Sequence, residues 1–67
     1  MIDRAILRQK MGEANLSQAA LGEKVGVSQQ MIAHILMGRK RPTLELAVSM
    51  ARALGCTVDE LLESEEG

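Results

Sequence analysis

Residues that typically begin or end an α-helix divide this sequence into five short segments. Within each segment the apolar residues recur three or four positions apart, a spacing typical of helices and not of strands. The first segment runs from about Ile2 to Ala14, and Asn15 after it tolerates the left-handed conformation that ends many helices. The residues expected on its inward face are Ile2, Ile6, Leu7 and Met11.

Serine residues stand at the start of the next two segments. Ser17 is placed to cap a helix over Gln18–Val25, and Gly26 is suited to the positive φ that ends it. Ser28 is placed to cap the following helix, which Gly38 ends. Both predictions rest on local side-chain chemistry and not on the rest of the fold.

Threonine residues stand at the start of the last two segments as predicted N-caps. Thr43 caps a predicted helix that runs to about Leu54 and is stopped by Gly55. Thr57 and Glu60 have the T-x-x-E spacing of a capping box, which opens a short fifth helix. The sequence therefore predicts an all-α fold of five short helices.

Composition limits the chain to one small domain and excludes several kinds of site. A single Cys among 67 residues permits no intrachain disulfide, and one His does not complete a four-ligand zinc site. No apolar run reaches the roughly 20 residues of a membrane span, and no signal peptide is recognisable, which indicates a cytoplasmic protein. We expect one domain over residues 1–63 and a frayed polar tail over residues 64–67. We expect no cofactor, no metal and no enzyme activity, because no base accompanies a nucleophile.

Charge is distributed unevenly along the chain. Residues 1–42 contain seven Lys and Arg against three acids, whereas residues 43–67 contain one Arg against six acids. Such a dipolar chain can present a basic face to phosphate groups, although solvated charges without a partner explain the pattern equally well. The absence of Phe, Tyr and Trp argues against single-stranded nucleic acid as the partner, since its bases usually stack on aromatic rings.

The third segment separates apolar and polar residues on a helical projection of about 100° per residue. Its predicted core face consists of Met31, Ile32, Ile35 and Leu36, and its other face of Gln29, Gln30, Ala33, His34 and Met37. Glutamine suits an adenine edge in the major groove, because its amide donates and accepts a hydrogen bond at once. On composition alone an ordinary solvated face is the more common explanation of such residues.

The segment from Leu16 to Leu62 resembles the helix-turn-helix domain of the Cro/repressor family, in particular the lambdoid phage repressors. The resemblance covers about three quarters of the chain. The residues that carry it are Gln18-x-x-Leu21-Gly22-x-x-Val25-Gly26-Val27-Ser28-x-x-x-Ile32, then Gly38 and Arg41-Pro42. Gly22 stands where the family prefers a small residue, because two helices cross there.

The resemblance implies a double-stranded DNA-binding transcriptional regulator, encoded by a bacterium or a phage, that represses by occupying a palindromic operator as a homodimer. The positions that match the base-reading residues of the family are Ser28, Gln29, Gln30 and His34. Those that match or adjoin its phosphate-binding residues are Gln18, Arg39, Lys40 and Arg41. The predicted dimer surface is the fifth helix, with Val58, Leu61 and Leu62, although much of the surface of the two leucines is expected to be buried in the core.

Several positions depart from the family pattern. Many members pair an Arg late in the first helix with a Glu late in the third, where this chain has Met11 and Leu36. Replacing both ions of a buried pair with apolar groups is commonly neutral or stabilising, so we expect these two side chains to touch. An exposed Leu36 beside Met37 is the alternative. Cys56 stands in a slot that is usually Val and is expected to be a small core residue.

A function of another class is an antitoxin-like module that binds and neutralises a partner protein. Its contact surface would use apolar residues beyond those the core needs, which are Met37, Leu46 and Val48. His34 leaves a further question open, since its protonation would make DNA affinity pH-dependent only if the imidazole contacts the duplex.

Overall fold

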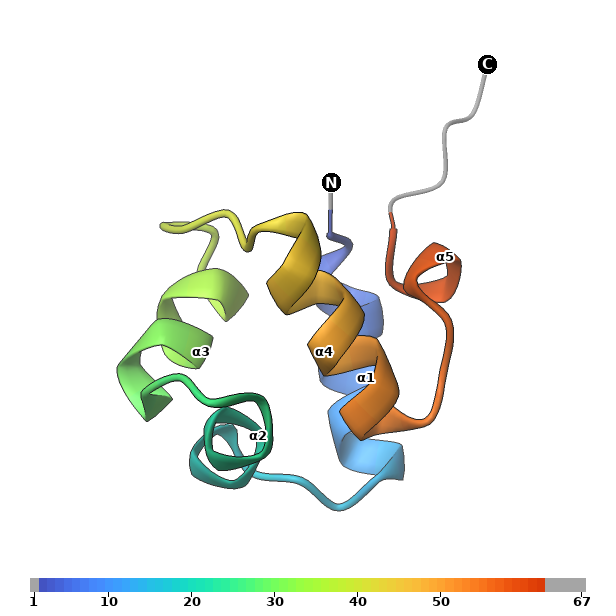
Figure 1. The fold of residues 1–67 in the computed structure, drawn as a ribbon, viewed down its shortest axis with the longest axis horizontal. Helices are drawn as coiled ribbons and strands as arrows, with labels where there is room; N and C mark the ends of the chain where they lie inside the picture. Colours follow the sequence, from blue (N-terminus) through green and yellow to red (C-terminus); the bar gives the residue numbers. More distant parts are fainter. Residues whose placement is uncertain (1, 63–67) are drawn as a thin grey trace.

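The computed structural model describes residues 2–62, and within them it contains five helices and no strand (Figure 1). The prediction of an all-α fold with five short helices is confirmed. The helices are α1 (Arg4–Glu13), α2 (Gln18–Val25), α3 (Gln29–Leu36), α4 (Leu44–Leu54) and α5 (Val58–Leu61).

Each of the last four helices begins at the cap residue expected from the sequence. The side chains of Ser17, Ser28 and Thr43 each accept a hydrogen bond of 3.1 Å from the backbone N–H three residues later. Thr57 and Glu60 form the complete capping box, with each side chain accepting from the other residue's backbone N–H. Local capping chemistry therefore fixes where these helices start.

The helix α1 starts two residues later than predicted. Asp3, not a residue before it, is the N-cap, and its carboxylate accepts from the backbone N–H groups of Ala5 at 2.9 Å and Ile6 at 3.2 Å. Ile2 lies outside the helix in an isolated antiparallel bridge with Leu62. Ile2 is buried by this pairing, although the sequence pattern assigned its burial to the helix.

The predicted stops adopt the conformations that end helices. Asn15 follows α1 with a φ of 57°, and the glycines after α2, α3 and α4 have φ values of 81°, 78° and 73°. The tail predicted for residues 64–67, and residue 63 before it, lie outside the described part of the chain.

One apolar core joins all five helices, and each helix contributes at least one side chain with no exposed surface. These side chains are Leu7, Leu21, Ile32, Met50 and Leu61. Met11 and Leu36, which replace the ion pair of relatives, are 6% and 3% exposed and belong to the same cluster. The alternative in which Leu36 is exposed is wrong; direct contact between the two side chains stays a prediction.

Gly22 permits a close approach between α2 and the turn that leads to α3. A Cβ atom at this position would lie 2.7 Å from the carbonyl oxygen of Val27. Val27 also donates its backbone N–H to the carbonyl of Gly22 at 2.9 Å. A glycine therefore lets this turn lie flat against α2, which sets the position of α3 relative to α2.

Polar contacts fasten α5 to α1 at the edge of the core. Lys10 lies 3.4 Å from Glu60 and 3.7 Å from Glu13, and these carboxylates raise the pKa of Lys10. Cys56, before α5, is half-buried against the core, as expected for a small packing residue. Burial raises the pKa of its thiol, which lowers the fraction of reactive thiolate.

Candidate nucleic-acid interface

The polar side of α3 faces solvent at its N-terminal half, opposite the core. Gln29 and Gln30 are exposed, whereas Ile32 and Ile35 on the other side are at most 2% exposed. His34 is half-buried one turn further along. The predicted separation therefore holds for Ile32, Ile35 and Leu36 against Gln29, Gln30 and Met37, whereas Met31 on the predicted core face is only half-buried, like Ala33 and His34 on the other.

The two amides on this face are available to an external partner. Within residues 2–62, no hydrogen bond engages the side chain of Gln29 or Gln30. Ser28, directly before them, accepts from the backbone N–H of Met31 through its hydroxyl oxygen, so its hydroxyl proton is free to be donated. An exposed surface with unsatisfied donors and acceptors can read the edges of bases.

Gln18 is the first residue of α2, directly after the capping Ser17. Its side chain is half-buried. The first backbone N–H groups of a helix lack partners within the helix and favour an anion nearby. Gln18 thus stands at an end of α2 that is suited to phosphate.

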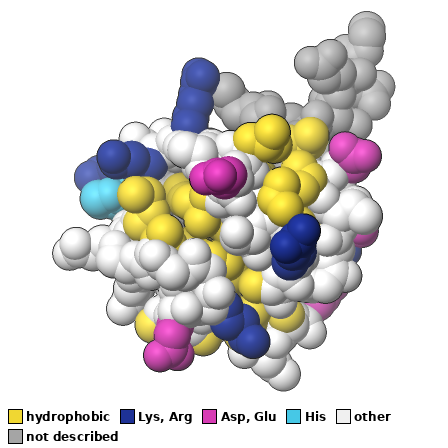
Figure 2. Space-filling view, in the orientation of Figure 1, with side chains coloured by type: hydrophobic (Ala, Val, Ile, Leu, Met, Phe, Trp, Pro, Cys, Tyr) yellow, Lys and Arg dark blue, Asp and Glu magenta, His cyan; other side chains and the backbone are white. Residues whose placement is uncertain are grey.

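The basic loop Arg39–Arg41 is attached directly to the end of α3. The backbone N–H groups of Arg39 and Lys40 both donate to the carbonyl of His34, at 2.8 and 3.3 Å. All three cations are exposed, and Figure 2 shows Lys and Arg side chains gathered beside the histidine. Within the described residues the ion pairs of the acidic side chains all involve Lys10, so the three loop cations keep their charge free of a carboxylate.

Two arginines of α1 reach the same region. From the sequence they were not predicted as site residues and were included only in the count of basic residues. Arg8 donates from Nη2 to the carbonyl oxygen of Leu36 at 3.2 Å. The guanidinium of Arg4 covers Gly38, where an added Cβ atom would lie 2.5 Å from Nη1. A cation beside the last carbonyls of α3 also interacts favourably with the helix dipole.

One feature of the sequence pointed to the contact between Arg8 and Leu36. The lost pair at Met11 and Leu36 removes the expected polar link between α1 and α3, and Arg8 lies one turn before Met11 on the same helix. Arg8 therefore restores a link through the backbone of Leu36 in place of its side chain. Only the three-dimensional structure shows which atom it contacts.

The residues predicted for the dimer surface do not share one environment. Leu61 has no exposed surface and belongs to the core, so its side chain is not available to a second subunit. Val58 and Leu62 are half-buried and keep some accessible surface. The dimer surface stays a prediction for these two residues and requires correction for Leu61.

Apolar surface beyond the core lies mainly at two residues. Leu44, at the start of α4, is 74% exposed and was not singled out from the sequence, and Met37 is 49% exposed. Leu46 and Val48 are half-buried. The strongest apolar exposure is thus on α4.

Residues 2–62 contain no cluster of three His, Cys, Asp or Glu side chains that could hold a metal ion. No helix in this range is long and apolar enough to cross a membrane.

The sequence matches the helix-turn-helix family over residues 7–61, which includes α2, the turn and α3. The chain belongs to the helix-turn-helix family. It is 44% identical over 52 residues to an HTH-type transcriptional regulator of Methanothermobacter thermautotrophicus, covering 78% of this chain and 75% of that protein. It is 36% identical, again over 52 residues, to an HTH-type transcriptional regulator of Methanocaldococcus jannaschii, covering 78% of this chain and 79% of that protein.

The fold is similar to that of a solved DNA-binding domain. The DNA-binding domain of the P22 c2 repressor, determined by nuclear magnetic resonance, matches with a TM-score of 0.83 and 30% sequence identity. The match covers 91% of this chain and 80% of that domain. The predicted resemblance to Cro/repressor-type helix-turn-helix domains is confirmed, and the fold is that of a DNA-binding regulator.

Proposed function

We propose that this protein is a transcriptional repressor that binds a palindromic double-stranded DNA operator as a dimer, with α3 in the major groove. The observation that carries the proposal is the exposed pair of amides, Gln29 and Gln30, on the side of α3 opposite the core. Repression would follow from occupancy, since a dimer on the operator blocks the access of polymerase.

The candidate residues divide into two roles by position and chemistry. Base reading is assigned to α3 and its cap, through Ser28, Gln29, Gln30 and His34. Backbone anchoring is assigned to Gln18 at the start of α2 and to the loop cations Arg39, Lys40 and Arg41. Contacts to phosphate fix register without reading sequence, whereas contacts to base edges supply specificity.

Dimerisation would relate two copies of α3 by a two-fold axis. Related dimers place their reading helices about 34 Å apart, one turn of DNA, which makes the preferred site approximately palindromic. The surface of α5 available for this contact is small, because Leu61 is buried and only Val58 and Leu62 retain accessible area.

Selection of binding sites from random duplexes tests the proposal directly. A palindromic consensus with half-sites one turn apart supports it, and recovery of no consensus refutes sequence-specific binding. On the selected site, Gln29→Ala or Gln30→Ala should cost about 1–3 kcal/mol and relax the preference at one base pair. Arg39→Ala should weaken binding to all sequences alike and lower the salt slope by about one.

Gln9→Ala is the matched control, because Gln9 lies on α1 and its amide donates to Glu13. This variant should bind the selected and scrambled duplexes as the wild type does. Equal losses on every sequence from Gln29→Ala, Gln30→Ala and Arg39→Ala would contradict the division of roles.

The exposed Leu44 and Met37 favour a protein contact as a second candidate function, in which the domain neutralises a partner as antitoxins do. Co-purification of a stoichiometric partner encoded by a neighbouring gene would support it. Specific DNA binding by the isolated protein would weaken it.

A further inference from the structure

The exposed side of α4 is a stripe of four residues, spaced i, i+3, i+4 and i+7, that the proposed DNA contacts do not use. The stripe consists of Glu45, Val48, Ser49 and Arg52. Val48 is half-buried and the other three are exposed, whereas Ala47, Met50 and Ala51 on the opposite side are buried in the core. This spacing is that of a helix face able to pack along another helix.

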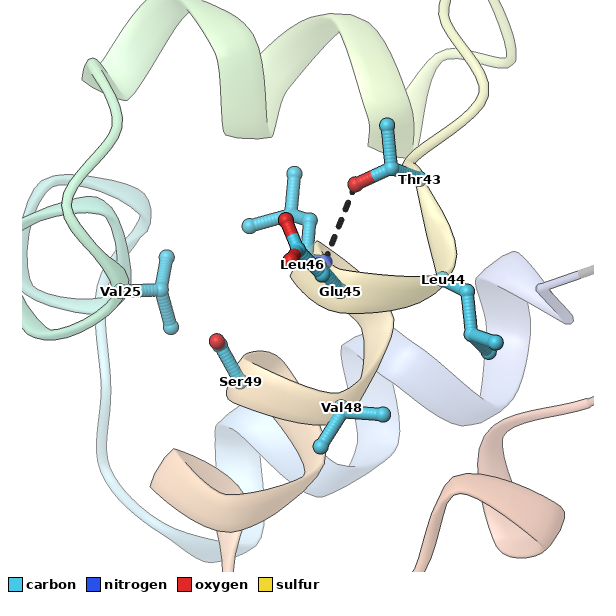
Figure 3. A pocket seen from close by; sticks show the side chains of 7 residues that line it. All are labelled: Val25, Thr43, Leu44, Glu45, Leu46, Val48 and Ser49. Carbon is cyan, nitrogen blue, oxygen red and sulfur yellow. Dashed lines mark hydrogen bonds between the residues drawn. The ribbon is translucent and has the colours of Figure 1, made fainter.

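Leu44 extends the apolar part of this surface. Its side chain is 74% exposed and stands at the edge of an open hollow that α4 forms with the end of α2 (Figure 3). The residues that line the hollow are Val25, Thr43, Leu44, Glu45, Leu46, Val48 and Ser49. Leu44 also lines a second apolar hollow together with Ala47 and Leu62, so the α4 surface continues into the accessible edge next to α5.

The stripe carries one charge of each sign at its ends. Glu45 lies in the first turn of α4 and Arg52 in the last. They are seven positions apart in the sequence, which is about 10 Å along the helix axis. In the part of the chain that the structure describes, neither takes part in an ion pair. Both charges are therefore free to pair with another molecule.

Two copies of this stripe have complementary charges when the two helices run antiparallel. If a second α4 is laid antiparallel on the first, with Val48 of each copy opposite Ser49 of the other, Glu45 of each copy faces Arg52 of the other. A two-fold axis produces this arrangement, because an isologous interface applies every contact twice. The small Ser49 at the centre lets the two helix backbones approach closely.

We infer that a second copy of this chain packs its α4 antiparallel against the α4 stripe, with two Glu45–Arg52 ion pairs flanking a centre of Val48 and Ser49. Leu44 and Ala53 lie on opposite flanks of the stripe, Leu44 toward Leu62 and Ala53 beside a shallow depression lined by Lys24, Ser49, Arg52 and Ala53. The inference rests on the proposed dimer and assigns its contact face to α4 in place of α5, where only Val58 and Leu62 retain accessible area.

The position of α4 in the molecule is compatible with DNA binding by such a dimer. In Figure 1 α4 crosses the face nearest the viewer, with α3 to one side of it and α5 to the other. A two-fold axis perpendicular to α4 and lying in this face reverses α4 and keeps both copies of α3 at the same edge. Both reading helices then meet the same side of a duplex.

Sedimentation velocity without DNA tests the inference, using charge reversals at the two ends of the stripe. Glu45→Arg alone places an Arg opposite Arg52 in both halves of the dimer, and Arg52→Glu alone does the same with two acids. Each single variant should raise the dimer dissociation constant about tenfold or more, since two exposed ion pairs become repulsive contacts. The double variant Glu45→Arg/Arg52→Glu should return to near the wild-type value.

The two single variants also complement each other. A mixture of Glu45→Arg with Arg52→Glu should form a heterodimer at concentrations at which each variant alone is monomeric. Only an antiparallel pairing of these two positions predicts this rescue. The control is Glu23→Arg on α2, which reverses an exposed charge outside the stripe and should leave the dissociation constant unchanged. Thermal unfolding of each variant at low concentration checks that the monomer remains folded.

A wild-type protein that is monomeric up to millimolar concentration overturns the inference. So do single variants that dimerise as the wild type does, or a mixture that stays monomeric. Because the measurement contains no DNA, failure of the α4 interface is distinguishable from failure of the proposed operator binding, which the duplex selection measures separately.

Discussion

Two glycines inside helices provide a test of how tightly the reading helix is held. At Gly22 in α2 an added Cβ atom would lie 2.7 Å from the carbonyl oxygen of Val27 and 3.2 Å from the carbonyl carbon and oxygen of Ser28. At Gly12 in α1 an added Cβ atom meets nothing within 4 Å. Neither glycine has a positive φ, so alanine is sterically allowed by the backbone at both positions.

The same substitution should therefore have opposite consequences at the two sites. Alanine in a helix is favoured over glycine by roughly 0.5–1 kcal/mol, and Gly12→Ala should raise the free energy of unfolding by about that amount. Gly22→Ala gains the same propensity but forces the Val27 turn away from α2, and overpacking of this kind costs about 1–3 kcal/mol. The difference between the two variants is thus about 1–3 kcal/mol, or roughly 4–8 °C in Tm for each kcal/mol.

Urea unfolding measures the difference in free energy of unfolding between the two variants. Far-ultraviolet circular dichroism is the appropriate probe, because the chain has no aromatic residue. The slope of the free energy against urea should be unchanged, since both variants bury the same chain. Gly22→Ala should also weaken binding to the selected operator, because α3 moves relative to α2. If both variants are stabilised, with free energies of unfolding within about 0.5 kcal/mol of each other, the close contact between Gly22 and the Val27 turn is refuted.

Two further predictions concern the links that α1 makes. The hydrogen bond from the backbone N–H of Thr57, with help from Lys10, holds the pKa of Glu60 below its ordinary value of 4.5. A lowered folded-state pKa gives stability that is present above the unfolded value and lost as pH falls through the folded value. Glu60→Gln should therefore flatten the acid side of the stability profile, measured by urea unfolding between pH 6 and pH 3; an unchanged profile would contradict the assignment. Arg8→Met should cost about 1 kcal/mol by removing the charged donor to the carbonyl of Leu36, and a Tm equal to that of the wild type would show that this contact contributes nothing.

The parts of the fold predicted correctly are those fixed by neighbours in sequence. Ser17, Ser28 and Thr43 cap helices through atoms only three residues away, so a short window contains the whole interaction. The start of α1 was predicted wrongly because Ile2 is buried by pairing with Leu62. Residues 3–61 lie between them, and no local pattern predicts such a pairing.

In the candidate site too, the features fixed by neighbours in sequence were predicted and those fixed by distant contacts were not. The periodicity of α3 placed Gln29 and Gln30 on the side away from the core, since helical geometry alone decides which residues share a face. The contact of Arg8 with the carbonyl of Leu36 depends on how α1 crosses α3, which the sequence does not state. The exposure of Leu44 was missed for a related reason, because its position in the first turn of α4 places it beyond the reach of the core.

The bridge between Ile2 and Leu62, reinforced by the 2.8 Å hydrogen bond from the backbone N–H of Asp3 to the carbonyl of Leu61, makes the described chain nearly circular. A short peptide joining these two positions would close the ring without moving a helix. New termini could then be opened in the loop that contains Asn15, far along the chain from the basic loop. A circular permutant of this design would keep the order of the helices in space while changing their order of synthesis.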